Sequence, residues 1–244
     1  MKKPKPVKSL HIKIFADGAE KESMIALSKE PYIKGLTTNP TLMKKAGITD
    51  YAAFAKDILT HITHKPISFE VFSDDFAEME RQARIINSWG KNIYVKIPVT
   101  NTKKKSAAAL VKKLSKEGIR LNVTALLTLA QVKEMTAALS PDTPAIISVF
   151  AGRIADTGYD PLPIMKAAKA ITKKKKNIEL LWASPRQLLD LYNAEAAGAD
   201  IITVTPDILK KLDKVGYDHT KLSLDTVKMF YDDGQKVGYK LYDA

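Results

Sequence analysis

The chain's strongest constraint on its fold is an alternation of short apolar runs with longer amphipathic stretches along nearly its whole length. Most of the runs are continuously apolar and rich in Ile and Val, which is typical of strands covered on both faces. The predicted strands are residues 11–16, 33–37, 66–72, 92–98, 119–124, 145–150, 178–183 and 200–204.

The stretches between these strands have the spacing of amphipathic helices. The predicted helices are residues 19–29, 51–61, 74–89, 106–116, 127–139, 161–172 and 185–196, followed by 206–212 and a last helix at 220–236. Eight strand–helix units in 244 residues predict an α/β fold, a (β/α)₈ TIM barrel with an additional C-terminal helix. We expect a basic tail at residues 1–10 and a single barrel domain at 11–244.

An open doubly wound sheet is the alternative architecture. Such a sheet ordinarily carries a glycine-rich phosphate loop after its first strand. The corresponding segment here, FADGAEKE at residues 15–22, has a single glycine. The pattern therefore favours the barrel.

The net charge of +12 raises the question of a nucleic-acid partner. Only five of the 39 basic residues are arginine, and the lysines occur in runs typical of solvated surfaces. This composition favours a lysine-rich surface over nucleic-acid binding, and a basic surface still attracts anionic metabolites. No apolar run approaches the ~20 residues of a membrane span, so we expect no membrane partner.

The chain has no cysteine, which excludes disulfides, thiolate nucleophiles and cysteine-based zinc sites. The basic N-terminal segment MKKPKPVKSL lacks the apolar region of a secretory signal. Together these features predict a cytoplasmic protein. Of the four histidines only His61 and His64 are close in sequence, and without a third ligand they predict no metal site.

Polar or charged side chains recur at the carboxyl ends of seven successive predicted strands, where barrels place their active sites. They are Asp17, Thr37 and Asn39, Glu70, Lys96, Asn122 and Thr124, Ser148 and Arg153, and Ser184 and Arg186. The eighth strand adds only Thr203 and Thr205. This convergence predicts a functional site at that end of the barrel.

Lys96 is the most informative of these residues because it lies inside an apolar strand, in NIYVKIPVT. Burial disfavours its ammonium form, and a neutral amine can attack a carbonyl to form a Schiff base. The alternative is a lysine whose stem lies along the barrel while its head reaches water or a carboxylate.

Asp17 and Glu70 supply two carboxylates, one to remove a hydroxyl proton and one to relay protons through water. Either could instead pair with Lys96, and Asp17 could cap the helix that follows it. Arg153, Ser184 and Arg186 are typical of an anion site after strands six and seven, where barrels often bind phosphate. Arg186 could alternatively be an ordinary residue of a helix's first turn.

Several motifs together resemble the transaldolase family, in its short group that also includes fructose-6-phosphate aldolases. They are FADG (15–18), GLTTNPT (35–41), YVKIPVT (94–100), LNVTAL (121–126), SVFAGRI (148–154), WASPRQ (182–187) and LSLDTVKMF (222–230). The matches run in order from about residue 12 to 236, and the combination is highly specific.

The resemblance implies a cofactor-free class I enzyme with Lys96 as the Schiff-base lysine and Asp17 as the acid/base. Glu70 and Thr124 would hold the catalytic water. The substrate-binding residues would be Asn39, Asn122 and Ser148 at the dihydroxyacetone unit, Arg153, Ser184 and Arg186 at the phosphate, and also Thr37 and Phe150.

The implied substrates are sugar phosphates, and the implied assembly is a homo-oligomer, a pentamer or a decamer. The aldolase branch carries Gln in place of Glu70 and Tyr in place of Phe150, so both positions favour a transaldolase. Two alternatives remain: an aldolase that releases free dihydroxyacetone, and a non-catalytic sugar-phosphate binder.

Overall fold

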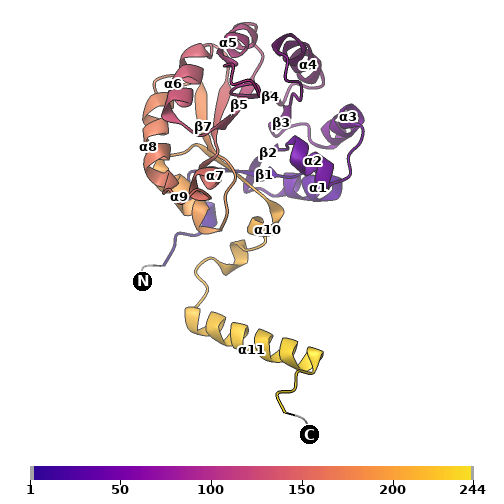
Figure 1. Cartoon of the computed structure of the whole chain (residues 1–244), viewed down its shortest axis with the longest axis vertical. Helices are drawn as coiled ribbons and strands as arrows, with labels where there is room; N and C mark the ends of the chain where they lie inside the picture. Colours follow the sequence, from indigo (N-terminus) through magenta and orange to yellow (C-terminus); the bar gives the residue numbers. More distant parts are fainter. Residues whose placement is uncertain (1–2, 243–244) are drawn as a thin grey trace. The chain divides into compact units, whose positions relative to one another are not determined.

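The computed structural model describes residues 3–242 and contains a closed barrel of parallel strands, β1 to β8 in sequence order (Figure 1). The strands are β1 (Lys13–Asp17), β2 (Ile33–Thr37), β3 (Ile67–Glu70), β4 (Ile93–Pro98), β5 (Leu121–Leu126), β6 (Ala145–Val149), β7 (Ile178–Trp182) and β8 (Ile201–Val204). β8 pairs with β1 and closes the barrel. The predicted (β/α)₈ fold is confirmed, and each predicted strand contains or overlaps the observed one.

Helices alternate with the strands around the outside of the barrel (Figure 1). They are α1 (Lys21–Lys29), α2 (Pro40–Lys45), α3 (Tyr51–His61), α4 (Phe76–Ser88), α5 (Ala108–Lys116), α6 (Leu129–Ala138), α7 (Ala151–Ala155), α8 (Pro161–Thr172), α9 (Leu189–Ala197) and α10 (Pro206–Leu209). Side-chain caps define several starts, such as Asp50 before α3 and Asp75 before α4. With helices outside and side chains inside, the strands are buried on both faces, which explains their continuously apolar sequences.

The interior of the barrel has an apolar layer beneath a polar one. Phe15, Ile146 and Ile201 belong to one buried cluster. Each lies two residues before a polar residue in the last two positions of its strand, and residues two apart in a strand point to the same face. The Phe15 ring lies where a Cβ on Gly35 would come within 2.5 Å of it, so this layer requires a glycine there.

Two short helices, α2 and α7, were not among the predicted elements. They have six and five residues, too few to show a helical period. The helix predicted at 185–196 begins later, at Leu189, and the backbone N–H groups of Arg186 and Gln187 before it donate to the Asp190 carboxylate.

The chain divides into two compact units, and the barrel occupies residues 11–209. The second unit, residues 3–10 and 210–242 of the described chain, contains α11 (His219–Val237) and two short 3₁₀ helices, Val7–Ser9 and Leu212–Lys214. The predicted C-terminal helix is thus confirmed by α11. Within residues 3–242, no helix combines the length and apolar character needed to cross a membrane.

Candidate active site

A cavity of about 600 Å³ opens at the carboxyl ends of the strands. All twelve predicted site residues line it: Asp17, Thr37, Asn39, Glu70, Lys96, Asn122, Thr124, Ser148, Phe150, Arg153, Ser184 and Arg186. They come from seven strands and the loops that follow them, so the strand alternation that was read from the sequence is what brings them together.

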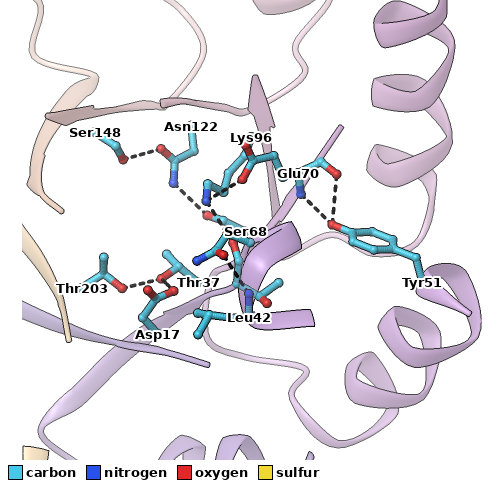
Figure 2. A network of polar contacts seen from close by, with 12 residues as sticks. Asp17, Thr37, Leu42, Tyr51, Ser68, Glu70, Lys96, Asn122, Ser148 and Thr203 are labelled. Atoms are coloured by element: carbon cyan, nitrogen blue, oxygen red, sulfur yellow. Dashed lines mark hydrogen bonds and ion pairs between the residues drawn. The ribbon is translucent and has the colours of Figure 1, made fainter. Parts of the chain in front are cut away.

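Lys96 and Glu70 form a buried ion pair at the centre of this cavity (Figure 2). They are register partners on β4 and β3, and Lys96 Nζ lies 2.9 Å from Glu70 Oε2. Nζ also donates to the backbone carbonyl of Thr38 at 2.9 Å. Only 7% of the Lys96 side chain is exposed, so Glu70 and the Thr38 carbonyl provide most of the polar contacts of Nζ.

Asp17 ends β1 and accepts a hydrogen bond from Thr37 Oγ1 at 2.8 Å, and Thr37 is also hydrogen-bonded to Thr203 (Figure 2). Burial raises the pKa of the Asp17 carboxyl, although Lys96 and Thr37 oppose that shift. The capping alternative is wrong, because the side chain that caps α1 is Glu20, which accepts from Ser23 N. Asp17 is therefore available to the cavity.

A chain of hydrogen bonds runs from β6 to β3 through Ser148 and Asn122, two residues that line the cavity (Figure 2). Ser148 Oγ donates to Asn122 Oδ1 at 2.6 Å, and Asn122 Nδ2 donates to Ser68 Oγ at 3.1 Å. Nearby, Thr124 Oγ1 is buried without a hydrogen-bond partner. A buried hydroxyl rarely remains unpaired, so Thr124 has capacity for a water or a substrate oxygen.

Asn39 has a structural bond as well as a place in the cavity wall. Its Oδ1 accepts from Leu42 N at 3.0 Å and caps α2, with Pro40 at the first helical position. This cap fixes the side chain, and its amide nitrogen is left to donate to a ligand.

The predicted anion site lies at the ends of β6 and β7. Arg153 lies on α7 with its guanidinium 5.6 Å from the centre of the Phe150 ring, and Arg186 Nε donates to Asp156 Oδ1 at 2.9 Å. Arg186 precedes α9, so it is not an ordinary residue of that helix's first turn. Both arginines are exposed at the rim of the cavity.

Ser184 reaches the cavity through a left-handed backbone conformation, with φ of 59°. Ala125, at a register shift between β5 and β6, has φ of 62° and also lines the cavity. Non-glycine residues adopt such angles rarely, and they concentrate where a chain must present particular groups to a ligand.

Two residues of this network were missing from the sequence prediction. Ser68 precedes Glu70 by two positions, so strand alternation could have placed it on the same face. Tyr51 lies on α3, and its hydroxyl contacts the backbone of Glu70. No local pattern marks that contact, which depends on the tertiary fold.

The arrangement is suited to carbonyl chemistry on an anionic substrate. It combines a buried primary amine, two carboxylates, hydroxyl and amide groups, and arginines at one end of the cavity. Across residues 3–242, no group of three or more His, Asp or Glu side chains is arranged to hold a metal ion.

Comparison with known proteins agrees with this reading. The sequence profile described as "Transaldolase/Fructose-6-phosphate aldolase" matches residues 14–241. Proteins named "Probable transaldolase" include one from Dehalococcoides mccartyi, 34% identical over 82% of this chain and 90% of its own length. Another, from Nitrosopumilus maritimus, is 33% identical over 93% of this chain and 96% of its own. A third, from Thermoanaerobacter sp., is 35% identical over 94% of this chain and 100% of its own.

Proposed function

Because the chain belongs to the transaldolase/fructose-6-phosphate aldolase family, we propose that it is a class I transaldolase. It transfers a dihydroxyacetone unit between sugar phosphates of the pentose phosphate pathway. The reaction converts sedoheptulose 7-phosphate and glyceraldehyde 3-phosphate into erythrose 4-phosphate and fructose 6-phosphate, and it also runs in reverse. The observation that carries the proposal is the buried Lys96 amine, 2.9 Å from Glu70, in a cavity with arginines at its rim.

The first step is imine formation. Glu70, in contact with Lys96 Nζ, takes the proton that the ammonium must lose. The free amine attacks C2 of the ketose phosphate, and the carbonyl oxygen leaves as water. The unpartnered Thr124 hydroxyl supports a water-binding position where the same water is later returned for hydrolysis.

The second step breaks the C3–C4 bond. Asp17 takes the proton of the C4 hydroxyl, the C4 oxygen becomes an aldehyde, and the bonding electrons pass to the iminium nitrogen to give an enamine. The aldose phosphate leaves. In the reverse direction the enamine C3 attacks the acceptor aldehyde, and Asp17 returns the proton to the new hydroxyl.

The other cavity residues position the substrate. Asn39, Asn122 and Ser148 orient the hydroxyls of the three-carbon unit, with Thr37 fixing the carboxylate of Asp17. Arg153, Ser184 and Arg186 bind the phosphate, for which Arg186 exchanges its bond to Asp156.

Transfer is favoured over release of free dihydroxyacetone because Phe150 brings no hydroxyl to the cavity wall. A water beside the enamine is then poorly positioned, and protonation of the enamine is slow.

The second candidate function is an aldolase that releases free dihydroxyacetone. That activity shares every step up to the enamine. A non-catalytic sugar-phosphate binder is disfavoured because binding does not require a buried amine beside a carboxylate.

The test compares the two fates of the enamine. With fructose 6-phosphate as donor, transfer to erythrose 4-phosphate should exceed dihydroxyacetone release at least about tenfold, a barrier difference of roughly 1.4 kcal/mol. Phe150→Tyr should narrow that ratio, whereas Phe76→Tyr, outside the cavity, should leave it unchanged. Equal or faster release without an acceptor would assign the chain to the aldolase activity.

This chemistry requires no metal or organic cofactor, since the iminium nitrogen is the electron sink. We further propose that the enzyme works in the cytoplasm, consistent with a chain that lacks cysteine.

We also propose that the protein forms a homo-oligomer. The support for it is α11, whose apolar residues Val227, Met229 and Phe230 are not buried within its own unit.

A further inference from the structure

One hydroxyl outside the cavity holds both backbone groups of Glu70. The Tyr51 hydroxyl accepts from Glu70 N at 2.8 Å and donates to Glu70 O at 3.0 Å (Figure 2). Tyr51 is the first residue of α3, so a helix outside the barrel reaches the strand residue that pairs with Lys96.

The Tyr51 hydroxyl makes the hydrogen bonds that a neighbouring strand would otherwise make to Glu70. On one side of β3, Ser68 O accepts from Thr38 N of the chain leaving β2, and two residues later Glu70 presents its N–H and C=O to the same side. By then the chain after β2 has turned into α2 at Pro40 and offers no partner. Without Tyr51, both backbone groups of Glu70 would lack a protein partner on this side.

The tyrosine is itself held firmly. Its ring packs against Phe69, Phe72 and Trp89, with ring centres 5.5 to 6.2 Å away. Burial raises the pKa of the Tyr51 hydroxyl above its usual range, so the group remains protonated and able to donate. The cluster therefore fixes both the place and the donor capacity of the hydroxyl.

We infer that Tyr51 is a positioning residue that sets the Glu70 carboxylate against Lys96 by fixing the end of β3. The inference rests on the proposed function, in which Glu70 takes the lysine proton and serves the catalytic water. Tyr51 does not touch substrate; it acts through Glu70, which projects into the cavity from the backbone that Tyr51 holds.

The first test is Tyr51→Phe, which removes the hydroxyl and keeps the ring. We expect kcat and the rate of borohydride-trappable imine formation to fall about tenfold, with KM for fructose 6-phosphate within about twofold, because the carboxylate is misplaced while the substrate contacts remain. Rates are normalised to trappable active sites, so a smaller folded fraction does not count as a slower enzyme. Tyr94→Phe makes the same change at a half-buried tyrosine outside the cavity and should match the wild type.

A double-mutant cycle with Glu70→Gln then shows whether Tyr51 acts through Glu70. If it does, Tyr51→Phe should cost little in the Glu70→Gln background. The inference would be overturned if Tyr51→Phe lowered kcat equally in the wild-type and Glu70→Gln backgrounds. It would also be overturned if Tyr51→Phe alone had the wild-type kcat. If Glu70→Gln itself left imine formation at the wild-type rate, the failure would lie in the role proposed for Glu70.

Discussion

Charged groups at the centre of this barrel occupy places where burial makes them costly, and each is held by a specific partner. Lys96 has Glu70 and a backbone carbonyl, and Asp17 has the Thr37 hydroxyl. Burying an ionised carboxylate or ammonium is unfavourable unless such partners compensate. The residues that perform the proposed chemistry are therefore also the residues at which stability and activity should conflict.

Asp17→Asn should separate activity from stability. The amide cannot take the C4 hydroxyl proton, so kcat should fall by about 10²- to 10⁴-fold. In the wild type, the raised pKa of Asp17 predicts that the acid limb of kcat/KM lies above the range of an ordinary aspartate. A limb within that range would contradict the role of burial.

The stability effect of the same variant depends on pH. A carboxyl whose pKa is higher in the folded than in the unfolded chain costs no stability below the unfolded pKa, and the full cost above the folded one. Asp17→Asn removes this cost, so its Tm should be at or above the wild-type value at neutral pH, and the difference should shrink toward pH ~4. Asp142→Asn, at an exposed position, should show no such trend.

At the residue scale, the sequence was sufficient to predict which side chains gather in the cavity. The ends of the apolar runs identify eleven of them and the family resemblance adds Phe150, and all twelve line one cavity. The sequence could not decide whether Lys96 is a Schiff-base lysine or a lysine whose head reaches water or a carboxylate. The observed ion pair with Glu70 is compatible with both interpretations. Nor could it predict the Tyr51 contact, since a hydroxyl on a helix meets a backbone 19 residues away only after folding.

Among the elements, α7 packs directly against the residues that follow β7. Gly152 N donates to Ala183 O at 3.2 Å, and a Cβ at Gly152 would lie 1.5 Å from the carbonyl oxygen of Ser184. A side chain there must displace the backbone of Ser184, which already has a left-handed φ.

Gly152→Ala should therefore weaken phosphate binding through the backbone. We expect a loss of about 1–3 kcal/mol in the free energy of unfolding from overpacking, and a KM for fructose 6-phosphate raised several-fold. Denaturant unfolding and steady-state kinetics check the two effects. Gly234→Ala, in α11 with nothing within 4 Å of the added Cβ, is the control and should not lower stability. Unchanged KM in Gly152→Ala would remove Ser184 from the phosphate site.

The longer helices were predictable from their period and the strands from their continuously apolar runs, whereas the short helices α2 and α7 were not. β6 illustrates the strands, since all five of its residues are buried. α2 lasts six residues, so only its end signals, Asn39 as cap and Pro40 behind it, mark it in the sequence. The residues before α9 donate backbone N–H groups to the Asp190 side chain, a contact that periodicity cannot reveal.

For the whole molecule, the proposed homo-oligomer predicts a mass larger than that of one chain. Light scattering should give a mass above the 27.0 kDa of a single copy. Replacing Val227 and Phe230, which are 60% and 66% exposed, by serine should lower that mass. Lys228→Ser changes a neighbouring polar position and should leave it unaltered. A wild-type mass of one copy would contradict the proposed oligomer.

The central claim, that Lys96 carries the substrate as a Schiff base, is tested most directly by borohydride reduction in the presence of fructose 6-phosphate, followed by peptide mass mapping. Reduction fixes the imine as a stable secondary amine, so the adduct marks the lysine that formed it. We predict a three-carbon adduct on Lys96, and neither adduct nor turnover in Lys96→Ala. An adduct on any other lysine, or turnover by Lys96→Ala, would contradict the account.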